Sequence, residues 1–246
     1  MPVPVRSRRE RPAKPALSRA WIVAETIRIM RTEGLEKATT RRVAQALDTG
    51  PASLYVYVAN TAELHAAVLD ELLGSLELRA NGDWRVRLRA LLHDYAAVLF
   101  TYPGLARSAS ALRPAGPRAV IFYDRVLGLL LDGGIKPARA AWGVDLVVQY
   151  VTANAAEHSA PGPGDIDAPA GDEARWNTLW LALHDVDPGT APHIAAHVDA
   201  VLGGTPAQRV DWAIEVLLAG VAATPTPLDD DRPLLTPPHP DYRILT

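Results

Sequence analysis

Apolar residues recur three and four positions apart along most of the chain, and nowhere is the alternation of a β-strand sustained. This periodicity predicts an all-α fold, with the helices separated by Gly and Pro breakers. The first helix begins at the cap residue Ser18 and ends at Gly34, and another begins at Asn60 or Thr61. The remaining expected helices span 40–47, 51–57, 84–101, 103–111, 116–132, 137–159, 172–186, 190–202 and 206–223.

The elements group into a small N-terminal head and a larger body. We expect a disordered Pro- and Arg-rich arm over 1–16, a three-helix head over 17–64, a helical body over 65–224 and a Pro-rich tail over 225–246. The helix that starts near residue 60 carries a leucine or valine every fourth position. It is long enough to link the head to the body, so the boundary should fall inside it.

Composition narrows the class of protein. The chain has no cysteine, which excludes disulfides, thiolate zinc sites and cysteine nucleophiles. It has no run of about 20 apolar residues, and no apolar run follows its N-terminal arginines, so we expect no membrane span and no signal peptide. These features favour a cytoplasmic protein.

Charge is divided unevenly along the chain. The net charge is −3, but residues 1–48 carry eleven Lys or Arg against five Asp or Glu, a net +6, and the remainder carries −9. A basic head on an acidic body localises attraction for a polyanion at one end of the molecule. The alternative is that the N-terminal arm is simply solvated and its arginines bind no polyanion.

Residues 39–57 form the most informative segment. They predict two very short helices joined by a tight turn, the first capped by Thr40 and the second opening with Pro51 at its first position. Helices this short persist in water only when they pack on something larger. A helix-turn-helix that enters the major groove of DNA is built in this way.

This segment resembles the TetR family of bacterial transcriptional repressors, and most closely the tetracycline-repressor branch. The resemblance covers roughly residues 17–73 and is carried by Leu17-Ser18-Arg19, by the run from Gly34 to Leu47 that contains Thr39-Thr40-Arg41-Arg42, and by Ser53-Leu54-Tyr55-Val56-Tyr57-Val58-Ala59-Asn60. It implies a helix-turn-helix DNA-binding head, and a body that binds a small-molecule effector and forms a homodimer. It further implies a repressor that the effector releases from operator DNA, with no cofactor.

The resemblance also implies which side chains contact DNA. An arginine at the position of Arg41 reads guanine in the closest relatives, and a guanidinium suits O6 and N7 of that base. The positions of Ser53 and Tyr55 match phosphate contacts, and that of Tyr57 faces the groove; alternatively, Tyr55 packs in the head and Tyr57 rests on the next helix. The full set is Thr40, Arg41, Arg42, Pro51, Ala52, Ser53, Tyr55, Tyr57 and Thr61.

The head departs from the family pattern in three places. Asp48-Thr49 replaces the usual Gly and aliphatic residue of the turn, and Thr61 stands where a phosphate-binding lysine is common. The start of the recognition helix offers few side-chain donors, so base readout should depend on Arg41, Ala52 and Tyr57. No operator sequence can therefore be transferred. The basic arm could supplement the missing lysine by contacting phosphates or a minor groove.

The sequence of the body predicts a dimer interface and a ligand pocket. The helix over 206–223 is apolar around most of its circumference, so we expect it to build a four-helix interface with the helix over 137–159; the alternative is an ordinary core helix. Glu77 replaces the histidine of the tetracycline–magnesium site, so tetracycline is not the expected effector. Candidate pocket residues are Tyr95, Leu99, Phe122, Trp142, Gln149, Asn154, Trp176 and Trp180.

The alternatives to a repressor are an enzyme and a protein-interaction module. An enzyme is not expected, since the chain has neither a Gly-rich phosphate loop nor a nucleophile elbow. His193 and His197 could pair on one helix face around a metal, but no third ligand is evident, so we expect no metal site. A helical protein-interaction module with a degenerate DNA-binding head remains the alternative to a repressor.

Overall fold

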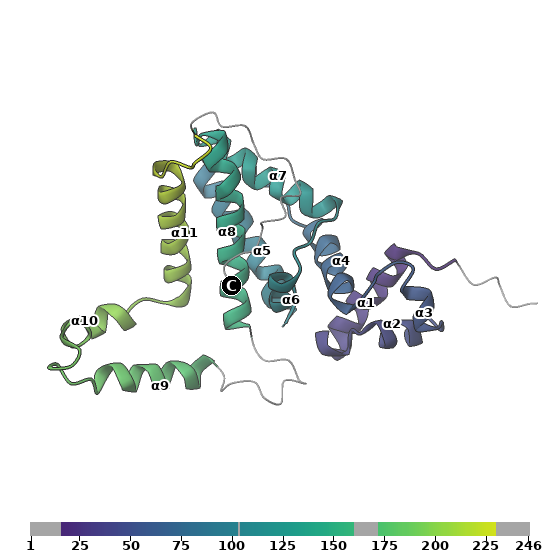
Figure 1. Cartoon of the computed structure of the whole chain (residues 1–246), viewed down its shortest axis with the longest axis horizontal. Helices are drawn as coiled ribbons and strands as arrows, with labels where there is room; N and C mark the ends of the chain where they lie inside the picture. The colour runs from purple at the N-terminus through teal and green to yellow at the C-terminus, as the bar shows by residue number, and fades with distance from the viewer. Residues whose placement is uncertain (1–15, 103, 160–171, 230–246) are drawn as a thin grey trace, which may run out of the picture.

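The computed structural model describes residues 16–102, 104–159 and 172–229, and this part of the chain is helical without any β-strand. The expected all-α class is therefore confirmed. Figure 1 shows the head at one end, formed by the first three helices, and the body at the other. The elements are α1 (Arg19–Glu33), η1 (Leu35–Lys37), α2 (Thr40–Ala46), α3 (Pro51–Leu54), α4 (Thr61–Leu73), α5 (Trp84–Thr101), α6 (Leu105–Ala111), α7 (Pro117–Asp132), α8 (Pro137–His158), α9 (Asp172–His184), α10 (Pro192–Leu202) and α11 (Pro206–Ala223).

The head is held by a small apolar core between α1, α2 and α3. The side chain of Ser18 accepts a hydrogen bond from the Trp21 N–H and caps α1, as expected. Gly34 ends α1 at a φ of 94°, a conformation that favours glycine. Fully buried side chains from all three helices meet in the core: Ile22, Ile29, Val43 and Leu54.

Local structure in the head differs from two expectations and adds one short element. Thr39, rather than Thr40, is the N-cap of α2, and its hydroxyl accepts from the Arg42 N–H at 3.2 Å. The chain forms a short 3₁₀ turn, η1, before that cap. The second helix, α3, ends at Leu54 rather than near residue 57. One turn of helix suffices there because Leu54 alone anchors α3 in the core.

The body is arranged around α8. This helix packs against α5, α6, α7 and α11, and its buried residues include Val147 and Val151. The expected bounds of α5 and α11 coincide with the observed ones, and those of α6, α7, α8, α9 and α10 differ by two residues or fewer. In Figure 1, α9 and α10 form a hairpin that stands away from the rest of the body. None of the described helices combines the length and apolarity needed to cross a bilayer.

Helix α4 connects the two parts. It packs against α1 in the head and against α6 and α7 in the body. Asn60 caps it by accepting from the Glu63 N–H at 2.8 Å. The helix ends at Leu73, earlier than its four-residue leucine spacing suggested, while Leu76 is buried just beyond it. A domain boundary inside α4 remains a prediction; the N-terminal arm up to residue 15 and the tail from residue 230 lie outside the described residues.

Candidate nucleic-acid interface

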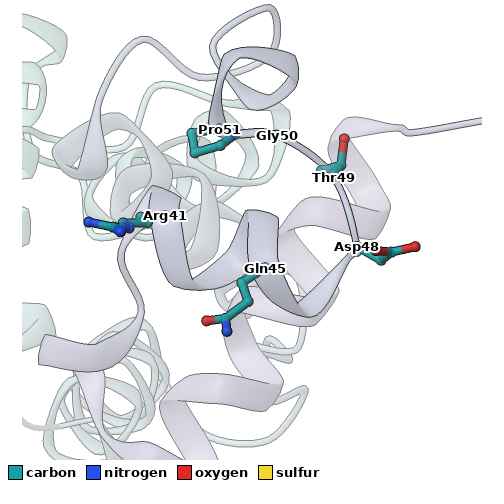
Figure 2. A pocket seen from close by; sticks show the side chains of 6 residues that line it. All are labelled: Arg41, Gln45, Asp48, Thr49, Gly50 and Pro51. Carbon is teal, nitrogen blue, oxygen red and sulfur yellow. The ribbon is translucent and has the colours of Figure 1, made fainter.

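A shallow hollow lies on the surface where α2 turns into α3. Figure 2 shows the six residues that line it: Arg41, Gln45, Asp48, Thr49, Gly50 and Pro51. Asp48 turns the chain with a φ of 51°, and aspartate tolerates this left-handed conformation better than most residues. The departure from glycine in this turn is thus accommodated without losing the helix-turn-helix.

Five of the nine proposed DNA-contacting residues are exposed around this hollow. Tyr55 is 56% exposed, so the alternative in which it packs in the head core is wrong. In the part of the chain that the structure describes, the Arg41 guanidinium makes no ion pair. Both groups are therefore available to a ligand outside the protein. The exposed residues are Arg41, Pro51, Ala52, Ser53 and Tyr55.

Thr40 and Thr61 turn toward each other instead of outward. Thr40 is buried, and its hydroxyl lies 3.5 Å from that of the half-buried Thr61. The pair joins the start of α2 to the start of α4. The expectation that Thr40 caps α2 was wrong, because Thr39 takes that role. The expectation that Thr40 receives a phosphate was also wrong, because its side chain is buried.

Arg42 and Tyr57 also bond within the protein. The Arg42 guanidinium donates to both carboxylate oxygens of Glu33, at 2.9 and 2.5 Å, and these bonds lower the pKa of Glu33. The Tyr57 hydroxyl donates to the Leu17 carbonyl at 2.7 Å. Tyr57 thus rests on the start of the head, neither on the following helix nor toward the groove. These three bonds commit both side chains to partners inside the protein.

Gln45 was missed by the sequence reasoning. It is exposed on α2, four residues after Arg41, and lines the same hollow. Residues four apart share a face of a helix, so this spacing was the available signal.

In the body, three of the eight candidate pocket residues come together in the core. Tyr95 and Phe122 lie with ring centroids 4.9 Å apart, and Leu99 is fully buried on the same helix as Tyr95. The Tyr95 hydroxyl is 2.7 Å from that of Thr152 on α8. Burial raises the pKa of Tyr95 to about 12, so its phenol is a neutral hydrogen-bonding group.

The other five candidates lie outside this cluster. Trp142, Gln149, Trp176 and Trp180 are exposed, and Asn154 is half-buried. Trp180 stacks on His184 of its own helix, and Trp176 lies under Arg209. Their helices present them at the surface of this single chain, so the structure does not bring all eight candidates together. The His193–His197 pair is likewise disturbed, because α10 kinks at His197.

The outer face of α8 and α11 is apolar and exposed. These helices lie side by side, and their outer residues repeat at helical spacing. Trp142 and Leu146 lie on α8, and Trp212 and Val216 on α11, with exposures from 42% to 70%. We call these four residues the α8–α11 face.

Comparison with known proteins identifies the family. Residues 78–224 match the family model described as the tetracyclin repressor-like C-terminal domain, which covers more than half of the chain. The chain belongs to the TetR family of transcriptional regulators. The resemblance that the head showed is therefore confirmed through the body, where the sequence alone had offered only the number and order of helices.

Individual relatives agree with this assignment. The HTH-type transcriptional repressor DrrR1 of Streptomyces coeruleorubidus is 31% identical over 147 residues, and the match covers 58% of this chain but only about half, 54%, of that TetR-type relative. The transcription regulator SCO7704 of Streptomyces coelicolor is 48% identical, with a TM-score of 0.74 over 87% of this chain and 98% of its own. ActR of Streptomyces coelicolor, solved with actinorhodin, is 28% identical, with a TM-score of 0.71 over 84% and 96%.

Proposed function

We propose that two copies of this chain form a repressor that binds operator DNA through both heads and leaves it when a small molecule occupies the body. The observation that carries the proposal is the exposed hollow at the α2–α3 turn, with Arg41 on one side and the start of α3 on the other. The family of the chain is regulatory, so we assign no catalytic role. A regulator of chromosomal operators works in the cytoplasm.

In this proposal Arg41 recognises a base, and the start of α3 lets the head approach the DNA closely. A guanidinium can bond O6 and N7 of guanine together. Pro51, Ala52 and Ser53 are small, so α3 can lie near the base edges. The exposed hydroxyls of Ser53 and Tyr55 suit phosphate oxygens, which fix the position of the head without selecting a sequence.

The second copy covers the α8–α11 face. Two tryptophans with exposures of 51% and 70% lie on this face, and a large exposed apolar patch marks an interaction surface. A twofold axis would set both α8–α11 pairs against each other as a four-helix bundle. The two heads must then lie about 34–36 Å apart to enter successive major grooves.

The effector binds near Tyr95 and Phe122, and α5, α7 and α8 move apart to make room for it. Aromatic walls with a few polar groups are typical of small-molecule sites, and the Tyr95–Thr152 hydroxyl pair would supply the polar contact. ActR, a relative of this fold, was solved with actinorhodin, so we propose a largely aromatic effector. Glu77 in place of the expected histidine argues against a tetracycline–magnesium complex.

Binding to the promoter region beside the protein's own gene tests the proposal. We expect wild-type protein to prefer this fragment to random DNA of equal length, and Arg41→Ala to lose about 1–3 kcal/mol of binding free energy to the preferred fragment. Arg79→Ala, which removes an exposed body arginine paired with Asp94, controls for the loss of charge and should change binding little. If wild type binds both DNAs equally, the repressor proposal is wrong and the protein-interaction module is favoured.

A further inference from the structure

We infer that Gln45 is a second base-reading side chain, which acts with Arg41 from α2. This inference rests on the proposed function, because it names a specificity residue of the same DNA-binding surface. It assigns the reading of polar base edges to α2 rather than to α3, the helix that the sequence indicates as the recognition element.

The placement of Gln45 is the first support. Gln45 lies four residues, about one helical turn, after Arg41, and both are exposed and line the hollow. Figure 2 shows both side chains extending from α2 while Asp48 points the other way. In the described part of the chain, the Gln45 side chain makes no hydrogen bond. Its amide is therefore ready to bond a ligand.

The second support is that α3 has few polar side chains that could read a base. Its exposed residues offer a proline ring, the Ala52 methyl and a single hydroxyl from Ser53. Tyr57, expected to face the groove, instead gives its hydroxyl to the Leu17 carbonyl. With α3 nearly without polar side chains, the hollow has two long side chains with several donors, and both come from α2.

The chemistry of the amide selects a base. A glutamine can donate to N7 and accept from the N6 amino group of adenine at the same time, as an arginine donates twice to guanine. Four residues of helix rise about 6 Å, and successive base pairs are about 3.4 Å apart. The adenine read by Gln45 should therefore lie within about two base pairs of the guanine read by Arg41.

Base-by-base operator variants test the inference on the full-length protein. The site would be located by footprinting on the preferred promoter fragment, and each base pair would then be replaced in one half-site at a time. We expect wild type to lose about 5- to 150-fold in affinity when one particular A·T pair is replaced. Gln45→Ala should bind the original and that replaced site equally while keeping the other preferences. Gln45→Glu should shift the preference there toward cytosine, whose N4 amino group donates to a carboxylate.

The control is Glu36→Ala, an exposed change in the same head outside the hollow, which should keep every preference. If Gln45→Ala retains the wild-type pattern, or weakens all sites equally as a lost phosphate contact would, the inference is wrong and the proposed repressor function stands. If wild type itself prefers no fragment, the proposed function fails and takes this inference with it. Unchanged thermal unfolding of Gln45→Ala would show that a lost preference does not come from a damaged head.

Discussion

At the scale of single residues, His65 joins the head to the body. It is buried on α4, with one ring nitrogen 3.2 Å from the Ala38 carbonyl of the head and the other 3.0 Å from the Ser108 hydroxyl of α6. A neutral imidazole satisfies both partners, since one nitrogen donates to the carbonyl and the other accepts from the hydroxyl. Burial lowers the pKa of His65 and keeps it in this neutral form.

This contact predicts a dependence of stability on pH. Because the pKa of His65 is lower in the folded than in the unfolded chain, the unfolded chain binds more protons below about pH 6.5. The stabilisation is therefore complete above that pH and is lost as the pH falls below it. We expect the free energy of unfolding, measured in urea at pH 7.5 and 5, to fall more for wild type than for His65→Gln, which keeps a donor and an acceptor but does not titrate.

All other titratable groups are common to both proteins and cancel in the comparison. An equal fall in both would contradict the prediction. His65→Ala should in addition cost about 1–3 kcal/mol at pH 7.5, because the buried Ala38 carbonyl loses its partner.

The residue scale is also where sequence reasoning was least complete. The exposure of Arg41 and Tyr55 followed from the helix-turn-helix pattern, whereas the inward bonds of Arg42 and Tyr57 depend on partners 9 and 40 positions away. No local periodicity indicates such distant partners. Gln45 lies on α2, outside the recognition helix on which base-reading residues are expected, so the head pattern did not indicate it.

At the scale of elements, α4 holds the start of α7. The N-terminus of α7 has no cap of its own, since Gly116 lacks a side chain. Asp70 of α4 supplies the missing acceptor and takes a hydrogen bond from the Ala119 N–H at 2.8 Å. Arg118 of α7 pairs with Glu71 of α4 at 2.8 Å. Because Phe122 lies one turn beyond Arg118, a shift of α7 at the proposed effector site would reach α4 directly.

Removing this acceptor should destabilise the protein. We expect Asp70→Ala to cost about 1–2 kcal/mol in the free energy of unfolding, the usual effect of losing a helix cap. Asp70→Asn should cost less, because it keeps an oxygen acceptor and loses only the favourable charge at the helix end. Denaturant unfolding of the three proteins measures the order, and a stability of Asp70→Ala equal to that of wild type would contradict it.

A paired substitution sharpens this test. A Cβ on Gly116 would lie 2.3 Å from the Asp70 carboxyl carbon, so Gly116→Ala should force the two helices apart. In the Asp70→Ala background the obstruction is gone, and Gly116→Ala should cost less. Additive losses in this double-mutant cycle would mean that the two positions do not interact.

Element boundaries were largely predictable from the sequence. The expected bounds of α5 and α11 were right, and in the structure Asp83 and Thr205 cap these helices, each side chain accepting a backbone hydrogen bond. The cap of α2 was not, because Thr39 and Thr40 are chemically alike and only the backbone conformation distinguishes them. The 3₁₀ turn η1 was too short to leave a periodic signal.

At the scale of the whole molecule, exposed tryptophans mark apolar surfaces that the single chain does not bury. Trp142, Trp176 and Trp180 were expected to line a pocket because aromatic walls with a few polar groups are typical of small-molecule sites. Sequence periodicity cannot distinguish burial against a ligand from burial against a second copy. Trp142 and Trp212 are both exposed on the α8–α11 face, and this favours the second copy for these two residues.

A charge placed on the α8–α11 face should prevent dimer formation. We expect Trp212→Glu and Val216→Glu to sediment as monomers at micromolar concentration, because each would bury an unpaired carboxylate in an apolar contact. A monomer engages one half-site, so operator affinity should fall by about 100-fold or more, the gain that two linked binding units commonly provide. Analytical ultracentrifugation and binding titration would be run on the same samples.

Val120→Glu is the matched control, since Val120 is 58% exposed on α7 and lies off the α8–α11 face. It introduces the same charge into the same kind of surface and should leave both the dimer and operator binding intact. If it dissociates the dimer as Trp212→Glu does, the effect is one of charge alone and the face is misassigned. If instead the two α11 variants remain dimeric with lowered operator affinity, the second copy sits elsewhere, and the spacing of the heads must be set by other helices.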